Sequence, residues 1–375
     1  IVFGDWSSDV CSSDLNNNPL IVIDGIANRS MDRLSSSDIE SITVLKDASA
    51  AIYGAQAANG VILITTKRGV EGKPKITINV NQGWTMPTVL PQMADAATYA
   101  QMINEINYYD GLPPKYSAEE IQKYKDGSDP WNFPNTDWYG VTMKKASSQN
   151  FANLDLRGGS ASVKYYVSLG GNFQDGIYKN SATNYKQANF RSNIDATITQ
   201  NIKLSLDVAG RQETRNYPTR SASNIFSMLM RGYPVAHAYW PNGLPGPDIA
   251  LGNNPVVITT SMTGYDKQKD YIMESVIKLD INIPWVKGLS FASNISFDKN
   301  IRNEKLWETP WYLYVWDGVS YETDNTPLLS KALRGLPSPQ LTQGMTDGNR
   351  TTLNALINYT RSFANTHNIR LLVGS

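Results

Sequence analysis

The strongest constraint on residues 75–375 is a repeated alternation of apolar and polar side chains. At 163–169 every second side chain is apolar or aromatic, with Lys164 and Ser168 between them. A period of two indicates β-strands, and charged or amide side chains on the polar face exclude burial between two apolar layers. The same pattern recurs at 76–81, 152–157, 190–198, 202–208, 277–283, 289–297, 353–359 and 369–373, which makes nine candidate strands.

Connection lengths between these candidate strands alternate strictly between short and long. Short turns fall near 158–162, 199–201, 284–288 and 361–366, and long connections near 84–150, 171–186, 211–270 and 299–349. A soluble sandwich has no reason to keep every long loop on one side. Antiparallel membrane barrels do so, with tight turns facing the periplasm and long loops facing outside. We therefore expect a mostly β chain that forms part of an antiparallel transmembrane β-barrel.

Aromatic placement is consistent with that expectation. Phe190 and Phe297 fall at the outer ends of candidate strands, whereas Phe291, Tyr359 and the turn residue Trp285 fall at inner ends. Two aromatic girdles at the lipid interfaces would have this distribution. Core aromatics of an ordinary β protein are the alternative.

Composition excludes several classes of function. The 34 basic and 34 acidic residues balance, so no nucleic-acid partner is implied, and two histidines and one cysteine leave little for metal sites or disulfides. The chain lacks the common nucleophile, phosphate-loop and zinc-protease motifs. No apolar run approaches the ~20 residues that a membrane helix needs. We expect neither an enzyme nor a cofactor, and interpret Asp155, Asp195, Asp207 and Asp280 as facing a barrel lumen rather than as a glycosidase pair.

Residues 16–72 have a different pattern, that of a small α/β unit. Strands are predicted at 19–25, 42–46 and 61–66, with turns at Asp24-Gly25 and Asn59-Gly60. Ser37 and Glu40 have capping-box spacing and predict one helical turn, and Asp47 is placed to cap a helix over 48–53. Because this unit is short, it can bury only a small hydrophobic core. We therefore expect it to pack against a larger part of the protein.

The order of motifs in residues 19–69 closely resembles the plug region of the SusC/RagA family of TonB-dependent outer-membrane transporters. The likeness is carried by Pro-Leu-Ile-Val-Ile-Asp-Gly at 19–25, Asp-Ile-Glu-Ser-Ile at 38–42, Val-Leu-Lys-Asp-Ala-Ser-Ala-Ala-Ile-Tyr-Gly at 44–54, and Ala-Asn-Gly-Val-Ile-Leu-Ile-Thr-Thr-Lys at 58–67. The segments at 135–138, 156–159 and 164–169 resemble the first barrel strands of that family. The family often has a basic residue where Gln56 stands, so a contact through that charge is in doubt here.

The resemblance implies a domain division and a fragment. Residues 1–15, Ser/Asp-rich and containing Cys11, are interpreted as a non-native leader; 16–72 as the C-terminal part of the plug; and 73–375 as the N-terminal part of the barrel. Such transporters have about 22 strands around a plugged lumen. Open sheet edges leave backbone groups unpaired in hydrocarbon, so we expect the isolated chain not to be a soluble monomer.

The implied function is active import across the outer membrane of a Gram-negative-type bacterium. The family implies an oligosaccharide or peptide substrate, a surface lipoprotein of SusD type as a lid, outer-membrane lipid around the barrel, and the TonB complex acting on the plug through a segment outside this chain. Two alternatives remain: a soluble secreted carbohydrate-binding β protein, which would bury both strand faces, and a passive porin, which would lack the unit at 19–69.

Candidate ligand contacts cluster at 126–139. The aspartates there lack the order of a calcium-binding loop. Trp131, Trp138 and Tyr139, with Asp137, are candidates to contact a sugar or peptide at the outer mouth. Anchoring of the barrel rim in the interfacial layer is the preferred alternative for these aromatics.

Overall fold

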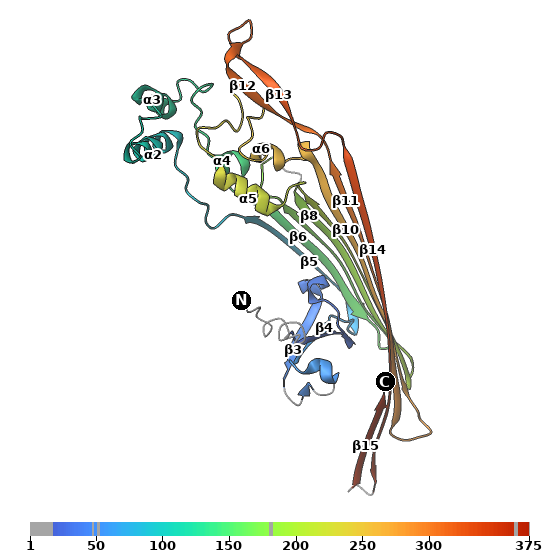
Figure 1. Ribbon diagram of the computed structural model, residues 1–375. Helices are drawn as coiled ribbons and strands as arrows, with labels where there is room; N and C mark the ends of the chain where they lie inside the picture. Colours follow the sequence, from blue (N-terminus) through green and yellow to red (C-terminus); the bar gives the residue numbers. More distant parts are fainter. Residues whose placement is uncertain (1–17, 47–48, 51–52, 180–182, 364–366, 375) are drawn as a thin grey trace, which may run out of the picture.

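The computed structural model describes residues 18–46, 49–50, 53–179, 183–363 and 367–374. It contains a long curved wall of strands, a small sheet on the concave side of that wall, and a group of helices and a hairpin at one end (Figure 1). The leader at 1–15 with Cys11 lies outside the described residues, and so does part of the helix predicted at 48–53 with its cap Asp47. None of the described helices is long and apolar enough to cross a membrane.

The wall is a nine-stranded sheet in which each strand pairs antiparallel with its neighbour along the wall, and β5 and β15 form the two edges. The sequence therefore identified the fold class correctly: a mostly β chain with an open stretch of antiparallel barrel wall. The strands are β5 (Gly72–Thr85), β6 (Ser147–Gly159), β7 (Val163–Asp175), β8 (Asn184–Thr199), β9 (Ile202–Tyr217), β10 (Gly264–Asn282), β11 (Leu289–Glu308), β14 (Gln340–Phe363) and β15 (His367–Gly374).

Most strands extend farther toward the long loops than the sequence predicted. β10 and β11 have 19 and 20 residues, and the ladder between them continues from Asn282–Ser290 to Gly264–Glu308. Beyond the apolar part most residues on both faces are polar, so the regular hydrophobic alternation ends although hydrogen bonding continues. Phe190 and Phe297 therefore lie inside β8 and β11 and not at strand ends, but both rings are exposed on the outward face.

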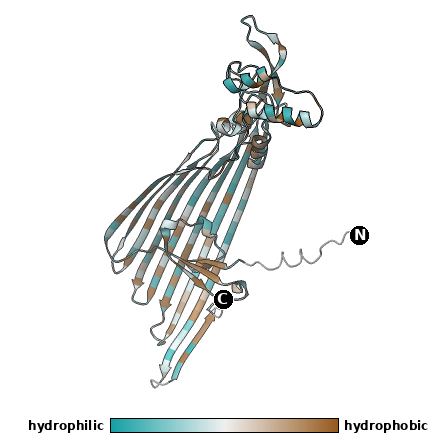
Figure 2. Ribbon diagram, turned by 90° about the vertical axis from the view of Figure 1, so that its left-hand side faces the viewer, coloured by the Kyte–Doolittle hydropathy of each residue, from teal (hydrophilic) through white to brown (hydrophobic). Residues whose placement is uncertain are grey.

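Burial in the wall is inverted relative to a soluble protein. Ile78 is 65% exposed and Leu371 57%, whereas Ser168 and Asn193 are fully buried. Figure 2 shows the corresponding alternation of hydrophobic and hydrophilic residues along the strands of the wall. The outward face therefore forms an apolar belt, as lipid contact requires. Members of the belt include Ile76, Ile78, Leu154, Leu169, Leu204, Leu206, Ile277, Ile295, Leu353, Ile357 and Leu371.

The small sheet has the strand order β2-β1-β4-β3, with β1 (Leu20–Ile23) and β4 (Val61–Thr66) parallel at its centre. β2 (Ile26–Ala27) follows the Asp24-Gly25 turn, and β3 (Ile39–Leu45) lies at the other edge. Asp24 and Gly25 have φ of 51° and 87°, which is the conformation of a tight hairpin turn.

The capping box predicted at Ser37 and Glu40 is wrong. A 3-10 turn, η2 (Ser36–Asp38), ends where β3 begins, and no side chain caps it. Glu40 lies on the strand, 3.6 Å from the guanidinium of Arg157. The local capping preference is overridden because Asp38 is held against the wall.

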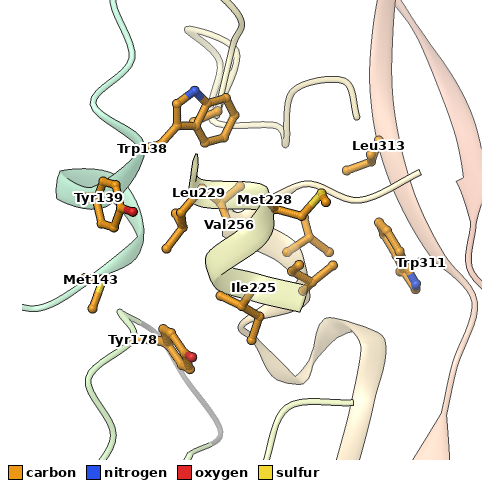
Figure 3. Packing of buried hydrophobic residues seen from close by; sticks show 13 residues of the cluster. Trp138, Tyr139, Met143, Tyr178, Ile225, Met228, Leu229, Val256, Trp311 and Leu313 are labelled. Atoms are coloured by element: carbon orange, nitrogen blue, oxygen red, sulfur yellow. The ribbon is translucent and has the colours of Figure 1, made fainter. Parts of the chain in front are cut away.

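Helices and a hairpin fill the long connections on the outer side and were not predicted. They are α2 (Ala96–Tyr109), α3 (Ala118–Asp126), α4 (Trp138–Thr142), α5 (Ala222–Arg231), α6 (Pro255–Ile258), and the pair β12 (Trp311–Tyr321) and β13 (Pro327–Arg334). A buried apolar cluster joins α4, α5, α6 and β12 (Figure 3). These loops therefore pack like a small soluble domain above the wall.

Ile277→Lys tests the lipid-facing assignment. Ile277 lies outward in the middle of the belt, where a lysine costs about 2–4 kcal/mol. The matched control is Leu333→Lys in β13, which is similarly exposed but lies outside the wall. The protein is expressed from its own gene, reconstituted in phospholipid vesicles and unfolded with denaturant. The free energy of unfolding should fall by this amount only for Ile277→Lys. Equal losses would contradict the assignment.

Candidate functional site: the contact between the small sheet and the wall

Asp38 is the most deeply buried charged group of this contact. Its carboxylate accepts hydrogen bonds from the Tyr166 hydroxyl at 2.9 Å, the Ser168 hydroxyl at 2.6 Å and Arg191 Nε at 3.3 Å. Tyr166 and Ser168 alternate on the polar face of β7, and Arg191 is paired with Ser168 on β8. A charge buried to 3% exposure is stable only with such partners. The wall thus presents a ready-made anion site to η2.

Arg29 forms the second anchor, after β2. Its guanidinium donates to both carboxylate oxygens of Asp298, at 2.5 and 3.1 Å, and to the carbonyl of Ser275 at 3.3 Å. The fork of donors matches the carboxylate in a way that a lysine could not reproduce. This anchor attaches the small sheet to β10 and β11, whereas Asp38 is held by β7 and β8.

Arg68 forms the third anchor where the chain leaves β4. It donates to Asp195 at 2.8 Å and Asp207 at 2.6 Å, both on the polar face of the wall. Nearby, the Asn193 amide donates to the Thr66 hydroxyl and to the Lys67 carbonyl. The predicted lumen-facing orientation of Asp195 and Asp207 is confirmed.

Gly69 shows how closely the chain approaches the wall as it leaves the small sheet. A Cβ added there would lie 2.1 Å from the backbone nitrogen of Tyr165 and 2.8 Å from Lys164 Cβ. No side chain fits in that space. The residue type at this position is therefore set by backbone-to-backbone contact with β7.

Polar groups account for this contact, because no apolar cluster of the described residues includes both the small sheet and the wall. The small sheet has its own core, formed by Leu20, Val22, Ala50, Ala57 and Val61. Water can replace hydrogen bonds and ion pairs when the surfaces separate, whereas a shared apolar core would resist separation. The chemistry of the contact is therefore that of a reversible docking surface. Gln56, where the family often has a basic residue, instead accepts from the Asn28 amide within the small sheet.

The residues predicted to contact a ligand lie in the outer loops, apart from this surface. Trp138 and Tyr139 are 3% and 6% exposed within the apolar cluster of Figure 3. The Trp138 indole donates to the Tyr233 carbonyl, and the Asp137 carboxylate caps α4 by accepting from Gly140. In this arrangement neither ring offers a free face to a sugar or to lipid. Asp137 and Tyr139 also line a cleft of about 750 Å³ beside residues 90–95.

Trp131 is half-buried and stacks on Trp240, with ring centroids 5.8 Å apart. His237 stacks on Trp240 at 3.9 Å and bonds the Pro130 carbonyl through Nε2 at 3.1 Å. Burial lowers the pKa of His237 below its usual value, so the ring is neutral at pH 7. No sequence spacing indicated this three-ring stack.

Comparison with known proteins agrees with this geometry. The family described as TonB-dependent Receptor Plug Domain matches residues 4–61. TonB-dependent receptor P26 of Formosa agariphila is 29% identical over 324 residues, covering 83% of this chain and 31% of that protein. TonB-dependent receptor SusC of Bacteroides thetaiotaomicron is 27% identical over 271 residues, covering 65% of this chain and 25% of that protein.

Among solved structures, the RagAB peptide transporter superposes with a TM-score of 0.69 at 19% identity, covering 96% of this chain and 41% of that chain. The resemblance to the SusC/RagA family of TonB-dependent transporters is confirmed. The small sheet is the plug fold of that family and the nine-stranded sheet is its barrel wall. These matches indicate an outer-membrane protein, and the relatives named here are receptors and a transporter. It spans about a third or less of the length of these curated relatives.

Arg29→Ala tests the second anchor. Removing one partner of a buried ion pair costs about 3 kcal/mol, so plug amides in β1–β4 should exchange hydrogen for deuterium roughly 100-fold faster. Arg29→Lys should restore only part of the protection, because it lacks the fork. The control is Arg334→Ala, which breaks the ion pair of Arg334 with Asp248 in the outer loops. Unchanged plug exchange in Arg29→Ala would refute the anchoring role.

The His237 stack predicts a pH dependence of the outer loops. The pKa of His237 is lower in the folded loops than in the unfolded loops, so the unfolded loops bind more protons. The folded loops therefore have their full stability above about pH 6.5 and lose stability as the pH drops below it. Near-ultraviolet circular dichroism from tryptophan should therefore weaken between pH 7 and pH 5. His237→Phe keeps a stacked ring without a titrating group and should give a flat profile. A wild-type signal that is constant over this range would contradict the prediction.

Proposed function

We propose that this chain is part of a TonB-dependent importer of the outer membrane of a Gram-negative-type bacterium, with residues 16–72 as part of its movable plug and 73–375 as part of its barrel. The observation that carries the proposal is the polar docking surface between plug and wall. A plug held by Asp38, Arg29 and Arg68 can leave the wall without exposing an apolar core. Water and a hydrophilic solute can then occupy the polar face that it vacates.

The driving force comes from outside the chain in this proposal. TonB pulls on the plug from the periplasm, and no covalent chemistry occurs. The substrate is an oligosaccharide or a peptide, and a SusD-like surface lipoprotein acts as the lid. A peptide is supported by the fold likeness to a protein described as a peptide transporter. The lipoprotein partner is what the resemblance to the SusC/RagA family implies. Of the four predicted ligand contacts we retain Trp131, whose ring is only half-buried, as the candidate.

Two other functions fit less well. A soluble carbohydrate-binding protein would not expose the apolar belt around Ile78, Leu206 and Ile277. A passive porin has no use for three charged anchors that hold a folded unit against its lumen wall.

A disulfide between plug and wall tests the proposal. Thr66 and Asn193 are hydrogen-bonded side chain to side chain at 2.9 Å, so Thr66→Cys and Asn193→Cys place two thiols opposite each other across the contact. Deletion of the gene, followed by growth on a panel of oligosaccharides and peptides, first identifies the substrate. Uptake by the double variant should then be lost under oxidising conditions and recover with a reductant.

The matched control crosslinks two strands of the wall without touching the plug. Asn294 and Asn354 are directly paired across β11 and β14, and their side chains are hydrogen-bonded at 2.8 Å. Cysteines at both positions should leave uptake unchanged when oxidised. Full uptake through the oxidised Thr66–Asn193 crosslink, or uptake that persists when the inner membrane is de-energised, would overturn the proposal.

A further inference from the structure

A groove of about 550 Å³ opens on the outward face of the wall between β8 and β11. Phe190, Tyr271 and Met273 form its sides, and Ala188 and Gly210 lie at its base. A Cβ at Gly210 would lie 2.2 Å from the Phe190 ring, so the ring packs directly on the backbone there. The groove exists because two neighbouring outward positions carry small residues. Its sides remain 40–46% exposed and largely apolar.

The groove lies at the outer limit of the apolar belt. From Ile202 at the inner end of β9 to Gly210 the strand advances eight residues, or ~27 Å at about 3.4 Å each. A tilt of 35–45° reduces this to roughly 20 Å across the bilayer, close to the ~25 Å height of a lipid-facing band. The positions between them, such as Leu204 and Leu206, are apolar and exposed. The groove therefore lies near the depth where acyl chains meet headgroups.

Exposed lysines occupy the outward positions immediately above the groove. Lys267 and Lys305 are directly paired across β10 and β11, and Lys269 lies on the same face two residues from Lys267. Lys186 occupies the same row as Lys269, with Thr214 of β9 between them. Among the residues that the structure describes, none of these four ammonium groups has a carboxylate oxygen within ion-pair distance. Lys299, at the edge of the groove, is paired with Asp347.

Charge is sorted between the two faces at this level of the wall. Glu213 and Asp270 lie on the lumen face, where Arg215 bridges them. They are therefore not available to the outward lysines. Like charges directly opposite each other on neighbouring strands are destabilising. The pair Lys267–Lys305 thus leaves a concentration of positive charge outside the barrel that an anion would neutralise.

We propose that the groove and the lysines above it form a binding site for an outer-leaflet lipid that carries phosphate. An acyl chain occupies the groove between Phe190 and Tyr271, and the phosphate contacts Lys267, Lys269 and Lys305. The occupant is a lipid because the apolar groove lies below the lysines, just as the acyl chains of an outer-leaflet lipid lie below its charged headgroup. Lysine suits this role as a compact charge for phosphate. The inference rests on the outer-membrane location and not on import.

Lipid retention by the purified protein tests the site. The protein is expressed from its own gene, held in an uncharged detergent and titrated with dioleoyl phosphatidic acid, dioleoylglycerol or inorganic phosphate, with bound lipid read by native mass spectrometry. Phosphatidic acid should bind at least about ten-fold more tightly than dioleoylglycerol. Inorganic phosphate should not displace it, because the groove contributes to binding.

Two variants separate the parts of the site. Lys267→Gln with Lys305→Gln should weaken phosphatidic acid binding about ten-fold, whereas the control Lys331→Gln, an exposed lysine of β13, should not change it. Ala188 is exposed, and Ala188→Phe would fill the groove. This change should weaken the binding of phosphatidic acid and of dioleoylglycerol by the same factor. The proposal would be overturned if the double variant or Ala188→Phe bound phosphatidic acid as tightly as the wild type. Complete displacement of phosphatidic acid by inorganic phosphate would also overturn it. Uptake is not measured, so the outcome is independent of the proposed import.

Discussion

In hydrocarbon, water is not available to the backbone, and the rest of this structure depends on that constraint. Every amide inside the apolar belt needs a hydrogen-bond partner within the protein. The continuous sheet from β5 to β15 provides these partners, because each strand bonds to its neighbour. The same constraint inverts burial. Apolar side chains such as Ile78 face outward, and polar ones such as Asn193 line the concave side. A wall built in this way has a polar inner surface from the outset.

That polar surface determines how the plug is held. The plug buries its own apolar residues in a small core and meets the wall through charge-assisted hydrogen bonds. The Asp38 carboxylate is surrounded by donors from β7 and β8, so the docked state is specific as well as tight. An interface of this kind combines strong positioning with reversible separation, because water can take over each bond. Gly69 adds a steric condition, since only a residue without a side chain allows the chain to pass β7.

Above the belt the physical conditions change, and so does the architecture. The outer loops bury Trp138, Ile225, Leu229 and Leu313 in a core like that of a soluble domain. The strands there carry polar groups on both faces, with lysines outward and an acid–arginine network toward the lumen. The boundary between these two regimes lies near Gly210 and Phe190. It is at this boundary that an apolar groove and exposed positive charge come together.

The sequence by itself determined the strands within the belt, their two faces and the side on which the long loops lie. These follow from local periodicity and loop length, which lipid contact and water impose on each strand separately. The motifs at 19–69 likewise identified the plug. Tertiary structure alone decided which charges meet, because Asp38 and Ser168 are 130 residues apart and strand register brings them together. It also decided that Ser37 and Glu40 do not cap a helix. Trp138 and Tyr139 looked exposed in sequence, but packing against α5 and α6 buries them, and no local pattern encodes that contact.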